Sequence, residues 1–411
     1  MNDGADASAN TGRADRWERV REIYAAARQQ PASVRAAWLE AQDMPADVGD
    51  EVRSLLAYAD QDDADDGFLA APVLPWSAVD PELDLQRRIG QRLGDWQITG
   101  RLGTGGMGDV FEVRRADGSF EGVAAVKLLK RGMDSAAVLQ RFAQERQALA
   151  RLNHPHIARL LDAGASEDGL PYFVLEYVEG RPIDEAVQGL TLEARLTLFL
   201  QLADAVAYAH RHLLVHRDLK PGNVLVDAEG RVKLLDFGIA KALDPLEAGD
   251  SHATIGGVRP YTPHYASPEQ VRGEPVGTAT DIYSLGVLLY QLLTGVRPTG
   301  RGATTPAEAA RSVLEDAPTR PSQLSADDAV DPQWLQTRRK LAGDLDNILL
   351  KALEKPAERR YASVDAMAAD VRAYLSGHPV SARAPRPAYV LGKFVRRNRW
   401  AVLAGALGGV G

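Results

Sequence analysis

Hydrophobic positions along the chain predict a small helical module at residues 15–60. Apolar side chains recur there at steps of three and four residues, the period of one helix face, at Trp17, Val20, Ile23, Tyr24 and Ala27. Pro31 suits the first turn of a second helix, and apolar positions at 48, 52, 55 and 56 indicate a third. The preceding residues 1–14 are small and polar, and we expect them to be disordered.

Residues 61–94 have the composition of a linker. They contain most of the acidic run "DQDDADDG" and the proline-bearing "APVLPW". Carboxylates that repel one another and prolines both oppose compact structure. We therefore expect the helical module to be a domain separate from the rest of the chain.

From residue 95 the pattern changes to that of short strands followed by long helices. Segments 95–103, 110–115 and 122–130 are rich in strand-forming residues and separated by glycine or turn sequences, which predicts an antiparallel meander. A helix comes next, with Phe142, Glu145, Leu149 and Leu152 on one face. Beyond 180 the helical segments are 192–212, 281–295 and 341–354. The prediction is an α+β architecture, with a small β-rich lobe at 95–175 and a larger α-helical lobe at 179–375.

The segment 281–295 is apolar nearly all round, which is compatible with a membrane-spanning helix or with a buried helix of a globular core. It is shorter than the roughly 20 residues of a membrane span and ends at Gly295, shortly before Pro298. We therefore expect a buried central helix.

Composition then excludes several classes of protein. Among 411 residues, 45% are hydrophobic and 25% charged, which is ordinary for a globular protein. A net charge of -8 argues against nucleic-acid binding through bulk charge. The absence of cysteine removes disulfides, thiolate nucleophiles and cysteine-based zinc sites. The first sixteen residues lack the apolar core of a secretory signal, so we expect a cytoplasmic N-terminus.

The last residues combine basic and apolar character. Lys393, Arg396, Arg397 and Arg399 directly precede an apolar run at 400–411. As a helix this run covers about 18 Å, against roughly 30 Å of hydrocarbon. It is either the start of a transmembrane helix, with 376–399 as a basic juxtamembrane segment, or a small hydrophobic tail that packs or frays. The basic collar and Trp400 favour the transmembrane helix, which would tether the chain to the inner membrane.

A glycine array occurs in the first strands. Gly103, Gly105 and Gly108 in "GTGGMGDV" give the spacing G-x-G-x-x-G, which also occurs in dinucleotide-binding proteins and in plain flexible turns. In the dinucleotide fold a helix follows the glycines, whereas here the strand-like "DVFEVRR" follows. A hairpin lid whose backbone approaches phosphate oxygens fits this context better. No Walker loop is present in the sequence.

A lysine and a glutamate are expected to face that lid. Alternation in "VAAVK" turns Ala125 and Lys127 to the same face of their strand. A lysine here is more often a surface residue, but Glu145 lies on the inward stripe of the next helix, where an unpaired carboxylate costs several kcal/mol. We expect the two to pair, with Lys127 against the α and β phosphates.

The stretch "HRDLKPGN" at 216–223 concentrates polar groups suited to catalysis. Asp218 can accept a hydroxyl proton, Lys220 supplies a positive charge, and Asn223 can return to the same cavity as a metal ligand. Asp236 in "LLDFG" follows an apolar run, which suits a carboxylate that holds Mg²⁺. Either aspartate alone is more often part of a surface turn, but the combination with the glycines, Lys127 and Glu145 predicts phosphoryl transfer.

These motifs together resemble the signature set of protein kinases. The resemblance covers residues 95–375 and rests on "GTGGMGDVF", "VAAVK", "HRDLKPGN", "DFG", "SPEQ" and "DIYSLG". The segments "TPHYASPEQ" and "DIYSLGVLLYQLLTG", with the basic tail, are most similar to those of membrane-anchored bacterial Hanks-type serine/threonine kinases. The resemblance implies the bilobal kinase fold, with one key helix in the small lobe. Lys220 stands where tyrosine kinases differ, which implies action on serine and threonine.

The resemblance also implies a role for each matching residue. Asp218 would be the catalytic base and Lys220 would contact the γ-phosphate, with Lys127 and Glu145 completing the catalytic set. Mg²⁺, with Mn²⁺ as an alternative, would bind Asn223 and Asp236. ATP would contact Gly103, Thr104, Gly105, Gly106, Gly108, Val110, Ala125, Lys127, Glu176, Val178 and Leu225. Structural roles would fall to Arg217, Asp281 and a pair formed by Glu269 and Arg360. One departure is Ser267, which replaces the usual alanine of its triplet.

Regulation and partners are implied by the same resemblance. Arg217, beside the base, can bind a phosphate on the segment between Asp236 and Glu269. Ser251 and Thr254 are the candidate phosphorylation sites, and modification in trans would need a transient homodimer. Protein substrates are expected, and nucleic acid is not.

Two other functions are compatible with parts of the sequence. A pseudokinase or signalling scaffold would bind nucleotide without efficient transfer, but it predicts loss of a key lysine, aspartate or asparagine, and all are present. A small-molecule kinase is disfavoured by the long segment that ends in "SPEQ", which suits a peptide-binding surface.

Overall fold

The chain divides into two compact units, Met1–Val79 and Asp80–Gly411. The computed structural model describes residues 87–104, 108–117, 122–130, 146–237, 263–325, 334–384 and 386–398, with Phe142 and scattered positions between 23 and 52. Described helical positions of the first unit form a small apolar cluster of Ala27, Leu39, Val48 and Val52. Most of the predicted module at 15–60, the N-terminus at 1–14 and most of the linker at 61–94 lie outside the described residues.

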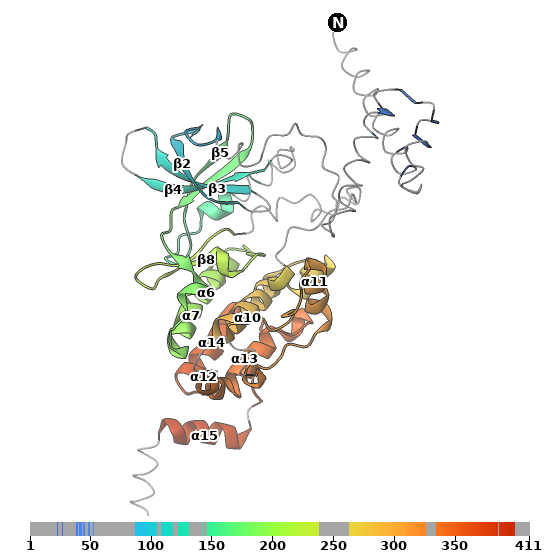
Figure 1. Cartoon of the computed structure of the whole chain (residues 1–411). Helices are drawn as coiled ribbons and strands as arrows, with labels where there is room; N and C mark the ends of the chain where they lie inside the picture. The colour runs from blue at the N-terminus through green and yellow to red at the C-terminus, as the bar shows by residue number, and fades with distance from the viewer. Residues whose placement is uncertain are drawn as a thin grey trace, which may run out of the picture. The chain divides into compact units, whose positions relative to one another are not determined.

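The small lobe is built on an antiparallel sheet (Figure 1). Its strand order is β1-β2-β3-β4-β6-β5, so β2, β3 and β4 form the predicted meander. The strands are β1 (Arg92–Leu93), β2 (Trp96–Thr104), β3 (Gly108–Arg115), β4 (Val123–Leu129), β5 (Leu160–Ala165) and β6 (Pro171–Glu176).

Side-chain alternation gives this sheet two different faces. In β4, Ala124 and Val126 are buried in a cluster with Phe111 of β3, whereas Ala125 and Lys127 are half-buried on the opposite face. The close approach of β3 to β4 requires glycine at 108, because a Cβ there would lie 2.5 Å from the carbonyl oxygen of Leu128. Glycine at 108 therefore lets β3 pair with β4 from its first residue, and Val110 lies beside Lys127 in this pairing.

The large lobe is helical (Figure 1). Its helices are α6 (Ile183–Ala186), α7 (Leu192–Arg211), α9 (Pro268–Arg272), α10 (Thr278–Thr294), α11 (Pro306–Glu315), α12 (Trp334–Leu341), α13 (Asp344–Ala352), α14 (Val364–Leu375) and α15 (Pro387–Arg397). A small sheet contains β7 (Arg181–Pro182), β8 (Val224–Val226) and β9 (Val232–Leu234). Short 3₁₀ turns are η1 (Pro221–Asn223), η3 (Pro263–Tyr265), η4 (Pro321–Gln323) and η5 (Ala357–Arg359).

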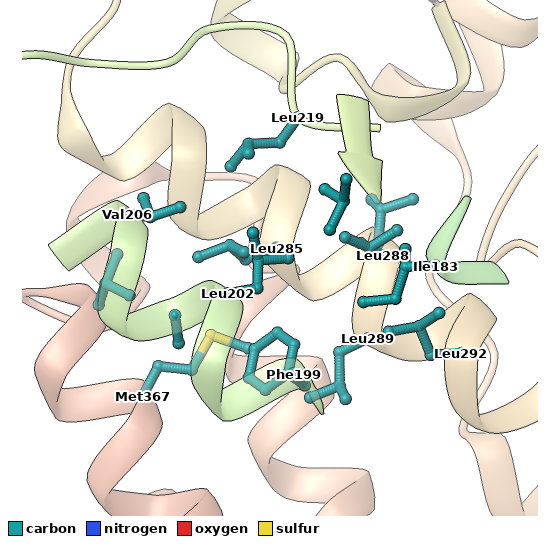
Figure 2. Close-up of a cluster of buried hydrophobic side chains, with 14 of the residues drawn as sticks. Ile183, Phe199, Leu202, Val206, Leu219, Leu285, Leu288, Leu289, Leu292 and Met367 are labelled. Atoms are coloured by element: carbon teal, nitrogen blue, oxygen red, sulfur yellow. The ribbon is translucent and has the colours of Figure 1, made fainter. Parts of the chain in front are cut away.

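Helix α10 lies at the centre of this lobe. Nearly all of its residues are buried, and Figure 2 shows Leu285, Leu288 and Leu289 packed against side chains of α7 and α14. The helix ends where Gly295 adopts a φ of 78°, a left-handed conformation suited to glycine. The structure therefore confirms the buried central helix expected at 281–295.

The predicted helix at 341–354 corresponds to α13, which begins three residues later than expected. Helix α12 ends at Leu341, Gly343 has a φ of 97°, and α13 begins at Asp344. A helix cannot pass through this backbone conformation, so the two segments are separate helices.

Membrane-spanning structure was a further expectation. Among the residues that the structure describes, no helix is both long enough and apolar enough to cross a bilayer. The predicted start of a transmembrane helix at 400–411 lies outside the described residues.

A buried ion pair joins α9 to the end of the lobe's core. The two terminal guanidinium nitrogens of Arg360 donate to the carboxylate of Glu269, at 2.7 and 2.8 Å, and Thr280 donates to the same carboxylate. Burial alone raises the pKa of Glu269, but the hydrogen bonds and charge of Arg360 outweigh it and hold the pKa below its ordinary value. The carboxylate is therefore ionised and fully paired.

Replacement of Arg360 by Met is expected to destabilise the fold by about 3–5 kcal/mol, because it leaves a buried carboxylate without a partner. Urea unfolding measures the loss. The matched control is Arg311→Met in the exposed pair of Arg311 with Glu315, where a loss below about 1 kcal/mol is expected. Equal losses in the two variants would contradict the importance of this pair.

Candidate active site

The loop at 216–223 is held from beneath by one buried carboxylate. Asp281 of α10 accepts hydrogen bonds from the backbone N–H groups of His216 and Arg217, both at 2.8 Å. His210, near the end of α7, binds the same carboxylate at 2.7 Å. Arg217 has a φ of 66°, a conformation that non-glycine residues rarely adopt, and these bonds hold it there.

Leu219 anchors the middle of the loop. Its side chain is buried, and Figure 2 shows it pointing toward Leu285 and the core of the large lobe. The flanking side chains of Asp218 and Lys220 are partly exposed, at 20% and 32%. Burial of Leu219 thus fixes the position of the loop relative to the core, and with it the positions of Asp218 and Lys220.

Asp218, Lys220 and Asn223 form one cluster. The Lys220 ammonium lies 2.9 Å from Asp218 Oδ2. The Asn223 amide nitrogen donates to the Asp218 backbone oxygen at 2.8 Å and to Oδ2 at 3.2 Å. Because the amide nitrogen is used to orient Asp218, the amide oxygen is the atom of Asn223 that suits a cation.

His216 connects this loop to the strand that leads to Asp236. Its Nε2 donates to the backbone oxygen of Leu235 at 2.9 Å, while the backbone N–H of Asp218 donates to Nδ1 at 3.3 Å. Burial lowers the pKa of His216 below its ordinary value, although the charge of Asp281 opposes this. A neutral imidazole satisfies both hydrogen bonds, because it has one donor and one acceptor.

Asp236 follows β9 in a left-handed conformation, with a φ of 48°. Its Oδ2 accepts a hydrogen bond from Lys127 Nζ at 2.7 Å, which joins the two lobes at this point. Its Oδ1 is buried and accepts no hydrogen bond from the described residues. A buried carboxylate oxygen without a partner is costly, and a hard cation such as Mg²⁺ would satisfy it.

An apolar pocket adjoins Asp236 on the small-lobe side. Its lining consists of Leu149, Leu152, Ile157, Ala158, Leu160, Leu175, Asp236 and Phe237. Phe237 also packs against the His216 ring, with centroids 5.1 Å apart. These surroundings exclude water from one side of Asp236, which strengthens its attraction to Lys127.

The expected nucleotide-binding residues occupy neighbouring positions on the sheets. Gly103 pairs with Val110, and Val110 pairs with Lys127, across β2, β3 and β4. Val110, Ala125 and Leu225 are each half-buried. Glu176, at the end of β6, forms an ion pair of 2.7 Å with Lys233 of β9.

Several expected site residues lie outside the described residues. These are Gly105, Gly106, Glu145, Ser251 and Thr254. The expected contact between Lys127 and Glu145 therefore stays a prediction, and the described partner of Lys127 is Asp236.

Sequence reasoning missed three residues that position the site. His216 was seen only as part of its motif, although its place two residues before Asp218 was a usable signal. Gln270 donates to the backbone oxygen of Arg217 at 2.8 Å, which ties α9 to the loop. Lys233 had no signal, because a lysine that alternates with apolar residues along a strand is usually a surface residue.

Residues 96–370 match the model of the protein kinase domain family. The chain belongs to the protein kinase family. The match spans both lobes and includes every described residue of the site. The kinase domain therefore accounts for the lobes, the loop at 216–223 and the position of Asp236.

Individual kinases are similar to this chain over the same region. A probable serine/threonine-protein kinase of Streptomyces coelicolor is 38% identical over 75% of this chain and 43% of its own length. The serine/threonine-protein kinase PrkC of Bacillus subtilis is 34% identical over 69% of this chain and 41% of its own length. The solved PknI kinase domain of Mycobacterium tuberculosis aligns with a TM-score of 0.52 and 26% identity, covering 70% of this chain and 98% of that one. The chain thus spans less than half the length of these curated relatives.

The pKa of His216 predicts how the stability of the kinase domain depends on pH. Because the folded chain binds this proton less readily than the unfolded chain, the stabilisation is present above the ordinary pKa of 6.5 and is lost as the pH falls below it. The free energy of unfolding should decrease from about pH 7 to 5.5, and His216→Gln should flatten this slope. The exposed His212→Gln serves as control and should keep the wild-type slope. Parallel slopes in all three proteins would rule out His216 as the source.

Proposed function

We propose that this chain transfers the γ-phosphate of ATP to serine or threonine hydroxyls of protein substrates, in bacterial signal transduction. The observation that carries the proposal is the cluster of Asp218, Lys220 and Asn223, together with the pair of Lys127 and Asp236. Those groups match the needs of phosphoryl transfer, which depends on positioning and on neutralising charge. The similarity to serine/threonine-protein kinases supports serine and threonine as acceptors.

In the proposed reaction, Asp218 orients the substrate hydroxyl and accepts its proton. The hydroxyl oxygen forms a bond to the γ-phosphorus, and the bond from that phosphorus to the β–γ bridging oxygen breaks, so ADP leaves. Lys220, adjacent to Asp218, offsets negative charge on the transferring group. Asn223 keeps the Asp218 carboxylate in place through its amide nitrogen.

Asp236 and Asn223 would hold Mg²⁺, with Mn²⁺ as an alternative. The buried, unpartnered Oδ1 of Asp236 supports this assignment, as does the hard oxygen character of both side chains. When bound, the ion neutralises charge on the β and γ phosphates. Lys127 donates a hydrogen bond to the other carboxylate oxygen of Asp236, and its ammonium would also contact the α and β phosphates.

The nucleotide itself would lie against the small-lobe sheet. In this proposal the backbone of Gly103, Thr104, Gly105, Gly106 and Gly108 covers the phosphates. Val110, Ala125 and Leu225 enclose the adenine, and the backbone at Glu176 and Val178 forms hydrogen bonds to it. The half-buried state of the three apolar residues supports this, since they retain surface for a ligand.

A pseudokinase that binds nucleotide without efficient transfer is the alternative function. The groups expected to perform the chemistry are all present, which favours catalysis. Asp218→Asn should lower the turnover number by about 10² to 10⁴, because the amide cannot accept the hydroxyl proton. Transfer of labelled phosphate to a generic serine/threonine protein substrate measures it. Asp365→Asn, in an exposed pair with Arg211, should retain wild-type activity. Equally low transfer by the wild type and Asp218→Asn would favour the alternative, whereas equally high transfer would remove Asp218 from the role of base.

We further propose autophosphorylation in trans, through a transient homodimer, at Thr254 or Ser251. Support comes from Arg217, whose backbone is fixed beside Asp218 by Asp281 and Gln270, and whose positive charge can bind a phosphate on the segment between Asp236 and Glu269.

When wild-type chain and ATP are mixed with the Asp218→Asn chain, the inactive chain should acquire phosphate within residues 241–262. Mass spectrometry detects it, and Thr254→Ala with Ser251→Ala should abolish most of it. An inactive chain that stays unmodified while the active chain is phosphorylated would show transfer in cis. No phosphate on either chain would contradict the regulation altogether.

The location of the kinase domain is also a proposal. The basic segment at 376–399 and the apolar run at 400–411 support a cytoplasmic domain tethered to the inner membrane by a helix that begins near Trp400.

A further inference from the structure

Helix α15 is attached to the kinase domain along one side. The Tyr389 hydroxyl accepts a hydrogen bond of 3.0 Å from the backbone N–H of Val380, and Arg383 stacks on the Tyr389 ring at 4.3 Å. Lys393, one turn further on, forms an ion pair of 2.6 Å with the buried carboxylate of Asp344. The helix therefore has a defined rotation relative to the large lobe.

The other side of α15 presents apolar side chains to solvent. Val390, Leu391, Phe394 and Val395 are 41%, 62%, 49% and 39% exposed. Their spacing places all four within an arc of roughly 140° on one face of the helix. Because Tyr389 and Lys393 hold the opposite part of the helix, this apolar face cannot turn inward without breaking their contacts.

The charged side chains of the segment that carries this face are all basic. Residues 376–411 contain no aspartate or glutamate, and their lysine and arginine residues are Arg383, Arg386, Lys393, Arg396, Arg397 and Arg399. Arg386 and Arg397 are exposed and fall at the edge of the apolar face. The chain as a whole has a net charge of -8, so this segment stands apart from the rest of the protein.

An apolar face bordered by arginines is complementary to the surface of an anionic bilayer. Such helices lie in the membrane plane, with the apolar side roughly 5–10 Å into the boundary between headgroups and acyl chains. Two further features favour a bilayer over a protein partner. None of the four residues of this face has a polar side chain for specific contacts, and the sequence continues into Trp400 and an apolar run.

We propose that α15 binds the surface of an anionic bilayer through Val390, Leu391, Phe394 and Val395, with Arg386 and Arg397 on the lipid headgroups. The contacts of Tyr389 and Lys393 then set the orientation of the large lobe on the membrane. This goes beyond phosphoryl transfer and beyond a spanning tether, because it concerns a helix that lies in the membrane plane.

The absence of cysteine from the chain permits a direct test. Leu391→Cys in the full chain is labelled with an environment-sensitive fluorophore and mixed with vesicles of phosphatidylcholine, with or without phosphatidylglycerol. On anionic vesicles we expect a blue-shifted, brighter emission that headgroup-level spin-labelled lipids quench. The matched control is Leu213→Cys, at another exposed leucine, which should keep its aqueous emission.

Three results would overturn the proposal. One is aqueous emission at position 391 in chains that sediment with the vesicles, which would leave only a tether elsewhere in the chain. The second is absence of binding to anionic vesicles. The third is a blue shift without vesicles that grows with protein concentration, which would indicate self-association through this face. The readout uses no ATP, so none of these results bears on the kinase activity.

Charge removal provides a second, independent measurement. Each basic side chain near an anionic surface strengthens binding by roughly fivefold, so Arg386→Ser with Arg397→Ser should weaken partitioning to phosphatidylglycerol vesicles by about 25-fold. Phosphorylation of a soluble substrate should be unchanged, which shows that the variant is folded. An unchanged partition coefficient in the active variant would remove these arginines from the proposed contact.

Discussion

One buried carboxylate determines the geometry of the loop at 216–223. Asp281 receives two consecutive backbone N–H groups and a histidine, and no water is needed to satisfy it. Hydrogen bonds to a carboxylate are stronger than hydrogen bonds to a neutral acceptor. These bonds can therefore hold the strained backbone of Arg217. Since α10 is buried on nearly every side, its Asp281 carboxylate has a fixed position. The hydrogen bonds to this carboxylate then fix the position of the loop.

Hydrogen bonds to main-chain atoms connect this loop to the neighbouring segments. His216 transmits the loop position to Leu235, and Leu235 in turn donates to the Asn223 carbonyl at 2.8 Å. The acid at 218 and the acid at 236 are thereby held on adjoining segments of main chain. Gln270 adds a third connection, from the loop to α9, which the pair of Glu269 and Arg360 fixes in the core. The polar groups of the site therefore depend on a scaffold that contacts no substrate.

The sequence predicted those parts of the molecule in which a period or a fixed spacing carries information. Strand alternation assigned Ala125 and Lys127 to one face, and the apolar run at 281–295 indicated a buried helix. Contacts between distant segments carry no such signal: Lys127 and Asp236 are 109 positions apart, and only their family motifs related them. Lys233 was missed because its partner, Glu176, lies in another lobe. The start of α13 was predicted three residues too early because the apolar period continues across Gly343.

The pair of Glu176 and Lys233 has a consequence for the motion of the two lobes. It connects the end of β6, where the chain leaves the small lobe, to the strand that precedes Asp236, and both side chains retain some exposure to water. Mobile ions screen such a partly exposed attraction. Rising ionic strength should therefore weaken this connection between the end of β6 and β9, and with it one connection between the two lobes.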